Sequence, residues 1–174
     1  MKIAIMGYSG SGKSTLARLL AEKYQIDVLH FDRVQFLPGW AIRSDAEKTR
    51  LTEEFLNTHD AWVIDGTYSR FFFDRRMAEA DEIILLLFNR FACLHRAYRR
   101  YRKYKGCTRP DMAEGCGEKF DWEFAQWILR KGRSKKTKQL FGGVRDRFPD
   151  KVVIIKNQRQ LNAYMAVKGV SYGI

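Results

Sequence analysis

Proline and cysteine are scarce in this sequence, and it contains no long apolar run. The three prolines and the absence of a linker indicate a single domain, residues 1–174. The longest apolar run, Ile83–Phe88, is far too short to span a bilayer, so no membrane association is expected. The N-terminus lacks the apolar segment and cleavage site of a signal peptide, so none is expected. The three cysteines form no C-x-x-C pair, which predicts reduced thiols in a cytoplasmic protein.

Positive charge, in contrast, is abundant and unevenly distributed. The formal net charge is +12, of which residues 1–89 carry −2, residues 90–147 carry +11 and residues 148–174 carry +3. A segment with such an excess attracts polyanions. Nucleotide phosphates and nucleic acid would both satisfy it, so both stay open at this point.

Short apolar runs alternate with segments of helical periodicity. The runs, which we expect to be strands, are Lys2–Met6, Ile26–Phe31, Ala61–Ile64, Ile83–Phe88 and Val152–Ile155. Helices are expected at Ser14–Tyr24, Ala46–Asn57, Phe91–Lys105, Phe120–Arg130 and from about Gln160 onward. Continuous apolar runs are typical of strands buried on both faces of a parallel sheet. The pattern therefore predicts a three-layer α/β fold with ligands at the carboxyl ends of the strands.

Residues 7–14, Gly-Tyr-Ser-Gly-Ser-Gly-Lys-Ser, match the phosphate-loop pattern G-x-x-x-x-G-K-[ST]. The loop follows an apolar strand and opens an amphipathic helix, so its amides and the helix N-terminus would cradle the phosphates of ATP. Lys13 would reach the β- and γ-phosphates, and the Ser14 hydroxyl would ligate Mg²⁺. The predicted nucleotide-binding residues are Gly7, Ser9, Gly10, Ser11, Gly12, Lys13, Ser14 and Thr15.

Two carboxylates end neighbouring strands of the predicted sheet. Asp32 ends the second strand and Asp65 the third, so both are expected on the same edge as the phosphate loop. Phosphoryl transfer needs carboxylates near Mg²⁺ and near the acceptor hydroxyl. We expect Asp32 to bind the acceptor or the metal, and we expect Asp65 to bind the metal or a water molecule. Capping of the next helix or turn is the alternative for each, and His30 is expected to be a packed strand residue.

The basic segment predicts a lid over the nucleotide, spanning residues 96–135. Arg96 and Arg100 share one helix face, and Arg109 lies in the turn 106–111. Arginines on a closing element would stabilise charge on the transferred phosphoryl group. A solvated basic helix is the alternative. A second basic run, residues 130–138, is expected at the solvated surface, and nucleic-acid contact stays open for it.

Further blocks of residues accompany the phosphate loop in a fixed order along the chain. They are His30-Phe31-Asp32, Leu37-Pro38-Gly39-Trp40, Trp62–Tyr68, Ala80-Asp81, Arg109–Met112 and Glu118-Lys119-Phe120. Together they resemble the bacterial DNA topology modulation protein group, which is related to adenylate kinase, over residues 1 to about 160. The resemblance implies ATP use, a five-stranded parallel sheet in the order 2-3-1-4-5, helices on both faces, an acceptor-binding region at residues 33–60 and a helical lid.

The resemblance also bears on the acceptor. Asp65-Gly66 stands where adenylate kinases carry Asp-Gly-Phe-Pro-Arg, but the arginine here, Arg70, comes one position late. Arg43, Arg70 and Arg76 are candidates for binding an anionic acceptor, with Trp40 as a stacking surface or, alternatively, an aromatic that anchors a helix.

The sequence thus predicts an enzyme that uses ATP and Mg²⁺ to phosphorylate a small molecule, with nucleotides and nucleosides among the candidates. The catalytic residues would be Lys13, Asp32, Arg96, Arg100 and Arg109. N-K-x-D and L-S-G-G-Q elements are absent, which argues against regulatory GTPases and transporter ATPases. The main alternative is a nucleotide-binding regulator that contacts DNA through its basic segment, and an NTPase without an acceptor is a third.

Overall fold

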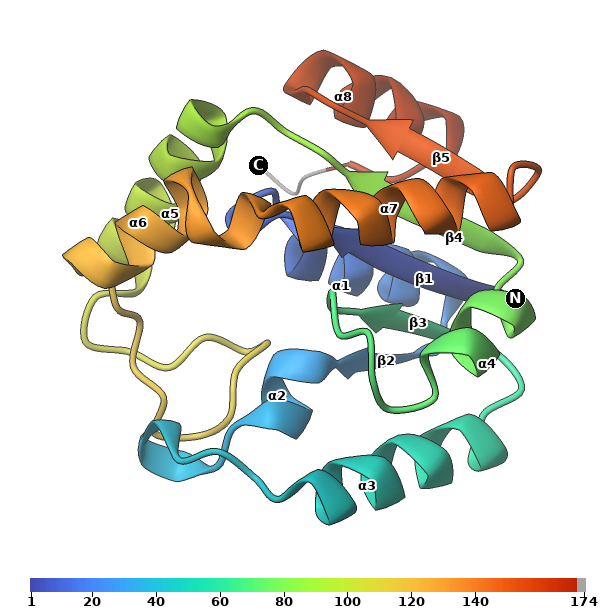
Figure 1. Ribbon diagram of the computed structural model, residues 1–174, viewed down its shortest axis with the longest axis horizontal. Coiled ribbons are helices and arrows are strands. Elements are labelled where there is room, and N and C mark those ends of the chain that lie inside the picture. The colour runs from blue at the N-terminus through green and yellow to red at the C-terminus, as the bar shows by residue number, and fades with distance from the viewer. Residues whose placement is uncertain (172–174) are drawn as a thin grey trace.

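The computed structural model describes residues 1–171 and is built around one parallel sheet (Figure 1). The strands are β1 (Lys2–Gly7), β2 (Asp27–His30), β3 (Trp62–Asp65), β4 (Glu82–Leu86) and β5 (Val152–Ile155). They pair in the order β2-β3-β1-β4-β5, each pair parallel. This confirms the predicted sheet and its order.

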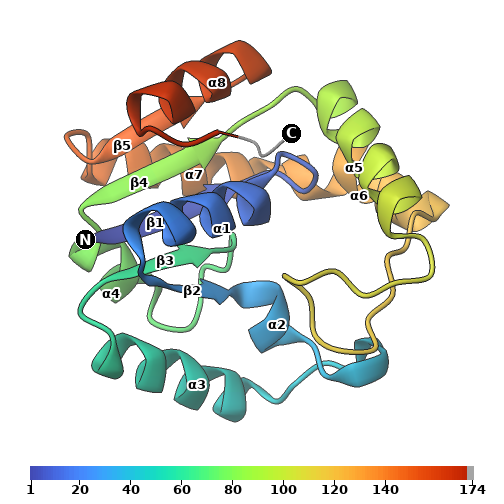
Figure 2. The ribbon, with the colours of Figure 1, turned by 180° about the vertical axis from the view of Figure 1, so that it is seen from behind.

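Helices cover both faces of the sheet and extend beyond one of its edges (Figures 1 and 2). The α-helices are α1 (Lys13–Tyr24), α2 (Phe31–Gln35), α3 (Asp45–Thr58), α4 (Phe73–Glu79), α5 (Arg90–Tyr104), α6 (Trp122–Leu129), α7 (Lys135–Arg147) and α8 (Gln158–Val167). Two short 3-10 helices, η1 (Pro38–Trp40) and η2 (Lys131–Arg133), join them. No helix among residues 1–171 is long and apolar enough to cross a bilayer.

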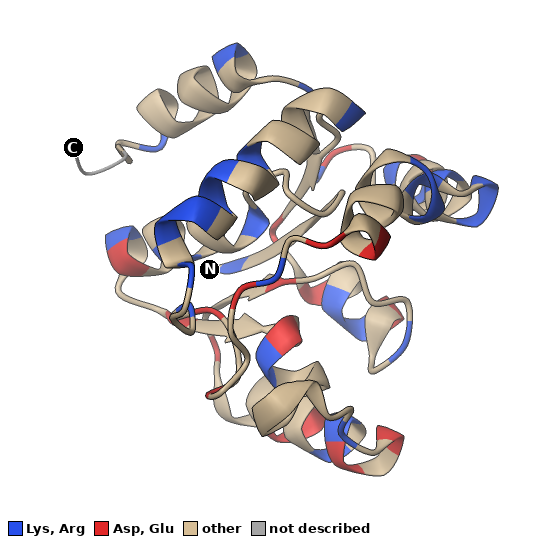
Figure 3. Ribbon diagram, turned by 90° about the vertical axis from the view of Figure 1, so that its left-hand side faces the viewer, with Lys and Arg blue, Asp and Glu red and all other residues tan. Residues whose placement is uncertain are grey.

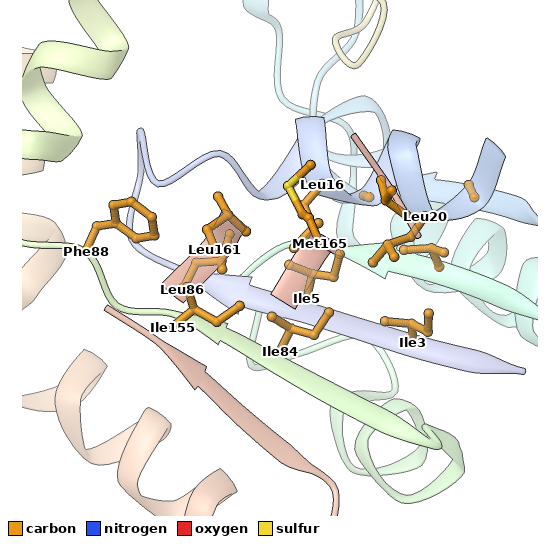
Figure 4. Close-up of a cluster of buried hydrophobic side chains, with 14 of the residues drawn as sticks. Ile3, Ile5, Leu16, Leu20, Ile84, Leu86, Phe88, Ile155, Leu161 and Met165 are labelled. Atoms are coloured by element: carbon orange, nitrogen blue, oxygen red, sulfur yellow. The ribbon is translucent and has the colours of Figure 1, made fainter. Parts of the chain in front are cut away.

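The central strand divides the core because its side chains alternate between the faces. Ile3 and Ile5 of β1 point toward α1 and α8, and Figure 4 shows them packed with Leu16 and Leu161 of those helices. Ala4 and Met6 lie on the opposite face, in a second cluster that contains residues of α3, α4 and α7. Both faces of the sheet are therefore covered, which explains why the strands read as continuous apolar runs.

Short polar side chains set where several helices begin. Ser44 accepts a hydrogen bond from the amide of Glu47 at 3.2 Å, at the start of α3. Asn89 accepts one from Ala92 N at 2.9 Å, and Asp121 accepts one from Phe124 N at 2.8 Å. These caps satisfy amides that have no partner within the helix. They also explain why α5 and α6 begin within two residues of the predicted positions.

The second strand is shorter than predicted. β2 ends at His30, and Asp32 lies in the short helix α2 rather than at a strand end. The chain turns at this point because Phe31 is buried in the core on the α3 side of the sheet. The amide of Phe36 then donates to the Asp32 carbonyl at 3.1 Å, which closes the helix.

Besides α2, the helices α4 and α7 were not predicted. Helix α4 is only seven residues long and begins after Phe71 and Phe72, both of which have positive φ. Helix α7 continues the basic run at 130–138, and it buries Phe141 and Val144 against the sheet. The apolar residues of α7 come after the run, so the charge pattern by itself did not indicate a packed helix.

Docking of α8 provides a test of this packing. Leu161 is fully buried, whereas Val167 on the same helix is 85% exposed. Leu161→Ala should lower the free energy of unfolding by about 2–5 kcal/mol because it leaves a cavity. Val167→Ala should change it by less than about 0.5 kcal/mol. Urea unfolding followed by circular dichroism measures both, and equal effects would contradict the described packing.

Candidate functional site

The phosphate loop connects β1 to α1 and is held at its start by β3. Gly7 N donates to the Thr67 hydroxyl oxygen at 3.0 Å, and that hydroxyl donates to Gly7 O at 2.9 Å. Within the loop, Ser11 N donates to Tyr8 O at 3.1 Å. Gly12 has a φ of 97°, and a Cβ there would collide with the guanidinium of Arg96. The loop therefore needs glycine at this position both for its turn and for the approach of that arginine.

Lys13 lies across the mouth of this loop. Its ammonium donates to Tyr8 O at 3.2 Å. Burial lowers the pKa of Lys13, and the nearby charges of Asp32 and Asp65 act in the opposite direction. The lysine thus lies between the loop and two carboxylates. The sequence analysis predicted that these residues would lie at the same edge of the sheet.

A large cleft of about 1370 Å³ opens above this edge. Its floor is made by the phosphate loop, Asp32 and Asp65, and its roof by α5, the segment 106–121 and α6. Of the predicted nucleotide-binding residues, those lining the cleft are Gly7, Ser9, Gly10, Gly12, Lys13, Ser14 and Thr15. Ser11 is the exception, because its side chain is fully buried beneath the loop.

Asp32 faces the cleft from α2 and accepts a hydrogen bond from the Tyr68 hydroxyl at 3.0 Å. Burial and then the charge of Asp65 raise the pKa of the Asp32 carboxyl, while Lys13 and Tyr68 hold it down. Burial and the carboxylate also raise the pKa of Tyr68, so its hydroxyl stays protonated and remains a donor. Tyr68 is a site residue that the sequence analysis named only within the block Trp62–Tyr68, without a role.

Asp65 has a partner that the sequence reading did not assign to it. The register of β2 and β3 places His30 opposite Asp65, and their side chains hydrogen-bond through Nδ1 and Oδ1. These side chains are only 6% and 5% exposed. Burial lowers the pKa of His30, but the hydrogen bond and the charge of Asp65 outweigh it and raise the pKa overall. His30 is therefore packed, as predicted, and also neutralises part of the charge of Asp65.

The residues present fit a magnesium ion that is bound with a nucleotide. No group of three or more His, Cys, Asp or Glu side chains suited to a metal occurs within residues 1–171. Mg²⁺ in nucleotide sites commonly uses one or two protein ligands together with phosphates and water. Ser14 and Asp32 both line the cleft and supply such oxygens. Asp65 also lines it, although its Oδ1 is bonded to His30.

The three predicted lid arginines all line the cleft, and two of them share a buried carboxylate. Arg100 Nε donates to Glu118 Oε1 at 2.8 Å, and Arg109 pairs with the other oxygen of Glu118. Arg109 also donates to Asp111 at 2.6 Å. Burial and the neighbouring Arg109 lower the pKa of Arg100, and Glu118 opposes this change. Glu118, to which the sequence reading gave no role, thus fixes both arginines.

Arg96 approaches the loop from α5. Its guanidinium lies 4.9 Å from the ring centroid of Phe88 and donates to the Gln158 side chain. A second arginine near the loop, Arg133, was missed because residues 130–138 were expected at the surface. Its guanidinium carbon is 3.8 Å from the Tyr8 ring centroid, and it donates to Phe88 O at 2.9 Å.

The side of the molecule that carries α5 and α6 shows how the charges are distributed (Figure 3). Lys and Arg mark several helices in this view, and Asp and Glu mark several of the segments that connect them. Trp127, from α6, donates its indole N–H to Ser9 Oγ at 3.2 Å. The roof of the cleft therefore contacts the phosphate loop directly.

The arginines predicted for the acceptor do not line the cleft. Arg43 donates to Val34 O at 3.0 Å, and Arg70 is exposed and paired with Asp45. Arg76 is fully buried and donates to backbone carbonyls, and burial lowers its pKa to about 9. Trp40, the fourth predicted acceptor residue, does line the cleft.

Comparison with solved structures supports the fold. An uncharacterized protein from Eubacterium ventriosum matches with a TM-score of 0.50 and 17% identity over 97% of both chains. A shikimate kinase from Bacteroides thetaiotaomicron matches with a TM-score of 0.49 and 16% identity, covering 96% of this chain and 95% of that one. No family model and no curated protein matches the chain. The likeness concerns the fold alone, and nothing in it supports the resemblance to the DNA topology modulation group.

The buried pair of His30 and Asp65 predicts a pH-dependent stability. Because the pKa of His30 is raised on folding, the pair stabilises the folded state fully below the unfolded pKa of about 6.5. This contribution is lost as the pH rises through the folded pKa. His30→Gln should therefore flatten the decline in unfolding free energy above about pH 6.5. The exposed His95→Gln is the control; urea titrations at several pH values in which both variants keep the wild-type slope would contradict the pairing.

Proposed function

We propose that the protein transfers the γ-phosphoryl group of ATP to a small-molecule acceptor. One observation carries the proposal: Lys13 of the phosphate loop and Asp32 face one cleft, beneath the arginines of the lid segment. A donor site, a carboxylate for the acceptor and cations for the transferred group are the components that phosphoryl transfer requires.

The donor phosphates would bind to the loop amides and the N-terminus of α1. Lys13 would hold the β- and γ-phosphates from its place across the loop. Ser14, together with Asp32 or Asp65, would hold Mg²⁺, which would neutralise phosphate charge. Burial lowers the pKa of Lys13, and the charge of bound phosphates would favour its protonated form.

Asp32 would orient the acceptor hydroxyl and take its proton. One of its oxygens accepts from Tyr68, which leaves the other for the acceptor. The raised pKa of the carboxyl brings it closer to the operating range of a general base. Tyr68 would keep the carboxylate in a single orientation.

Arg96, Arg100 and Arg109 would stabilise the charge on the phosphoryl group as it passes to the acceptor. Arg100 and Arg109 are already positioned by Glu118. The segment that carries Arg109 also contacts the region after β2, where Cys116 Sγ donates to Leu37 O at 3.3 Å. We therefore assign residues 96–135 as a lid that excludes water and residues 33–60 as the acceptor region of a single domain.

The regulator that binds DNA through its basic segment is not proposed as a second function. The arginines of that segment with the most specific contacts, Arg96, Arg100, Arg109 and Arg133, are directed at the cleft or the loop and have protein partners. Their charge is therefore accounted for within the proposed nucleotide site.

Lys13→Ala tests the donor site. It should lower kcat/KM for ATP by about 10²–10³-fold because it removes a cation from the β- and γ-phosphates. Lys23→Ala, an exposed lysine on the same helix, is the matched control and should behave as the wild type. ADP release coupled to an optical assay, with calorimetry of nucleotide binding, measures both. Unchanged ATP affinity and turnover in Lys13→Ala would refute the donor assignment.

Asp32→Asn tests the acceptor carboxylate. It should lower kcat by about 10²–10⁴-fold, since the amide cannot accept the proton, with a smaller effect on ATP binding. Asp150→Asn, at an exposed turn, is the control. The same assay measures kcat, and calorimetry measures ATP affinity. A variant that loses ATP binding but keeps kcat at saturation would show a role only in the nucleotide site.

A further inference from the structure

The wall of the cleft opposite the phosphate loop is aromatic and apolar. It is formed by Phe36 and Trp40 from the segment after β2, together with Met112 of the lid. The Phe36 and Trp40 rings pack edge to face, with centroids 5.1 Å apart. Asp32 and Tyr68 stand at its base. An acceptor that carries a flat ring and a hydroxyl group therefore fits here. Its ring can stack on the aromatic side chains, and its hydroxyl can donate to the Asp32 carboxylate.

This wall offers little to an anionic acceptor. Arg43, Arg70 and Arg76 point elsewhere: the first two pair with Glu47 and Asp45, and Arg76 is buried on backbone carbonyls. These three side chains lie outside the lining of the cleft. A phosphate on the acceptor would gain nothing from them.

Two of the cations that line the cleft, Arg109 and Lys119, come from the same segment as Met112. Arg109 pairs with Asp111 and Glu118. Lys119 is exposed, and its ammonium lies 5.0 Å from the centroid of the Trp40 ring. Asp32 and Asp111 add negative charge to the same space. An acceptor phosphate placed here would therefore meet Asp32 and Asp111 beside Lys119 and an arginine that already has two carboxylate partners, and bringing like charges together costs binding energy.

We propose that the acceptor is an uncharged alcohol that carries a flat ring, as an unphosphorylated nucleoside does, bound between the Phe36–Trp40 wall and Asp32. This proposal rests on the proposed phosphoryl transfer and specifies its substrate. The acceptor hydroxyl gives its proton to Asp32 as its oxygen forms a bond to the γ-phosphorus of ATP. The bond from that phosphorus to the β,γ-bridging oxygen breaks, and ADP leaves with the bonding electrons.

A paired acceptor panel tests the substrate class. Adenosine, uridine and thymidine, each beside its 5′-monophosphate, are incubated with Mg-ATP that carries a labelled γ-phosphate. Transfer of label should favour the nucleoside of at least one pair by about tenfold or more in kcat/KM. Preference for the monophosphate throughout, or label transfer to none of the nucleosides, overturns the proposal.

The uncharged acceptor and the phosphoryl transfer itself can be refuted independently of one another. Label that passes to a monophosphate and depends on Lys13 would leave phosphoryl transfer standing and refute the uncharged acceptor. Label found only in water, or in no acceptor at all, together with unaltered ATP binding in Lys13→Ala, would refute the transfer itself.

Substitutions of Trp40 and Arg70 test whether the acceptor binds at the Phe36–Trp40 wall. Trp40→Ala should raise KM for the nucleoside about tenfold with less than a twofold change in KM for ATP, and Trp40→Phe should restore most of the loss. Trp122→Ala is the matched control, since Trp122 is 75% exposed and outside the cleft lining. Arg70→Ala should leave KM for the nucleoside within twofold. An increase in KM in Arg70→Ala that exceeds that in Trp40→Ala would overturn the proposal, because it would show an anion-binding acceptor site.

Discussion

The parallel pairing of β1, β2 and β3 is the constraint on which the rest of the site depends. It aligns Ile5 with Asp65 and His30 with Asp65, so β2 and β3 end at one level while β1 continues to Gly7. Gly66 N then donates to Ile5 O at 3.0 Å, and the next residue, Thr67, bonds twice to Gly7. The phosphate loop therefore starts beside the carboxylates because the ladder continues to Gly66 and the Thr67 side chain then binds Gly7.

Charge balance at the cleft follows from this geometry. Asp65 is shielded by His30, which leaves Asp32 as the carboxylate that faces Lys13 with only a tyrosine bonded to it. On the roof, Glu118 holds two arginines that would otherwise repel one another. The cations and anions are thus fixed before a ligand binds, which reduces the reorganisation that phosphoryl transfer would require.

Local patterns in the sequence predicted the α/β fold and the position of the phosphate loop, whereas the strand order came from the family resemblance. The role of the loop in binding a nucleotide stays a prediction. Continuous apolar runs predicted the strands, and the loop motif predicted Lys13 at the start of α1. Contacts between distant segments were harder: the pairing of His30 with Asp65 and of Glu118 with Arg100 and Arg109 depends on register and on the path of the lid. Arg43, Arg70 and Arg76 were chosen by charge and position alone, and their partners in the fold direct them away from the cleft. The placement of Asp32 in α2 was missed because the apolar run continues through Phe31, whereas the strand ends at His30.

The most direct measurement is a crystal structure with a non-hydrolysable ATP analogue and Mg²⁺. The phosphates should lie on the loop amides with Mg²⁺ on Ser14 Oγ. The γ-phosphate should lie between Lys13 and the acceptor space next to Asp32. An analogue bound away from the loop, or one whose γ-phosphate points away from Asp32, would contradict the proposed transfer.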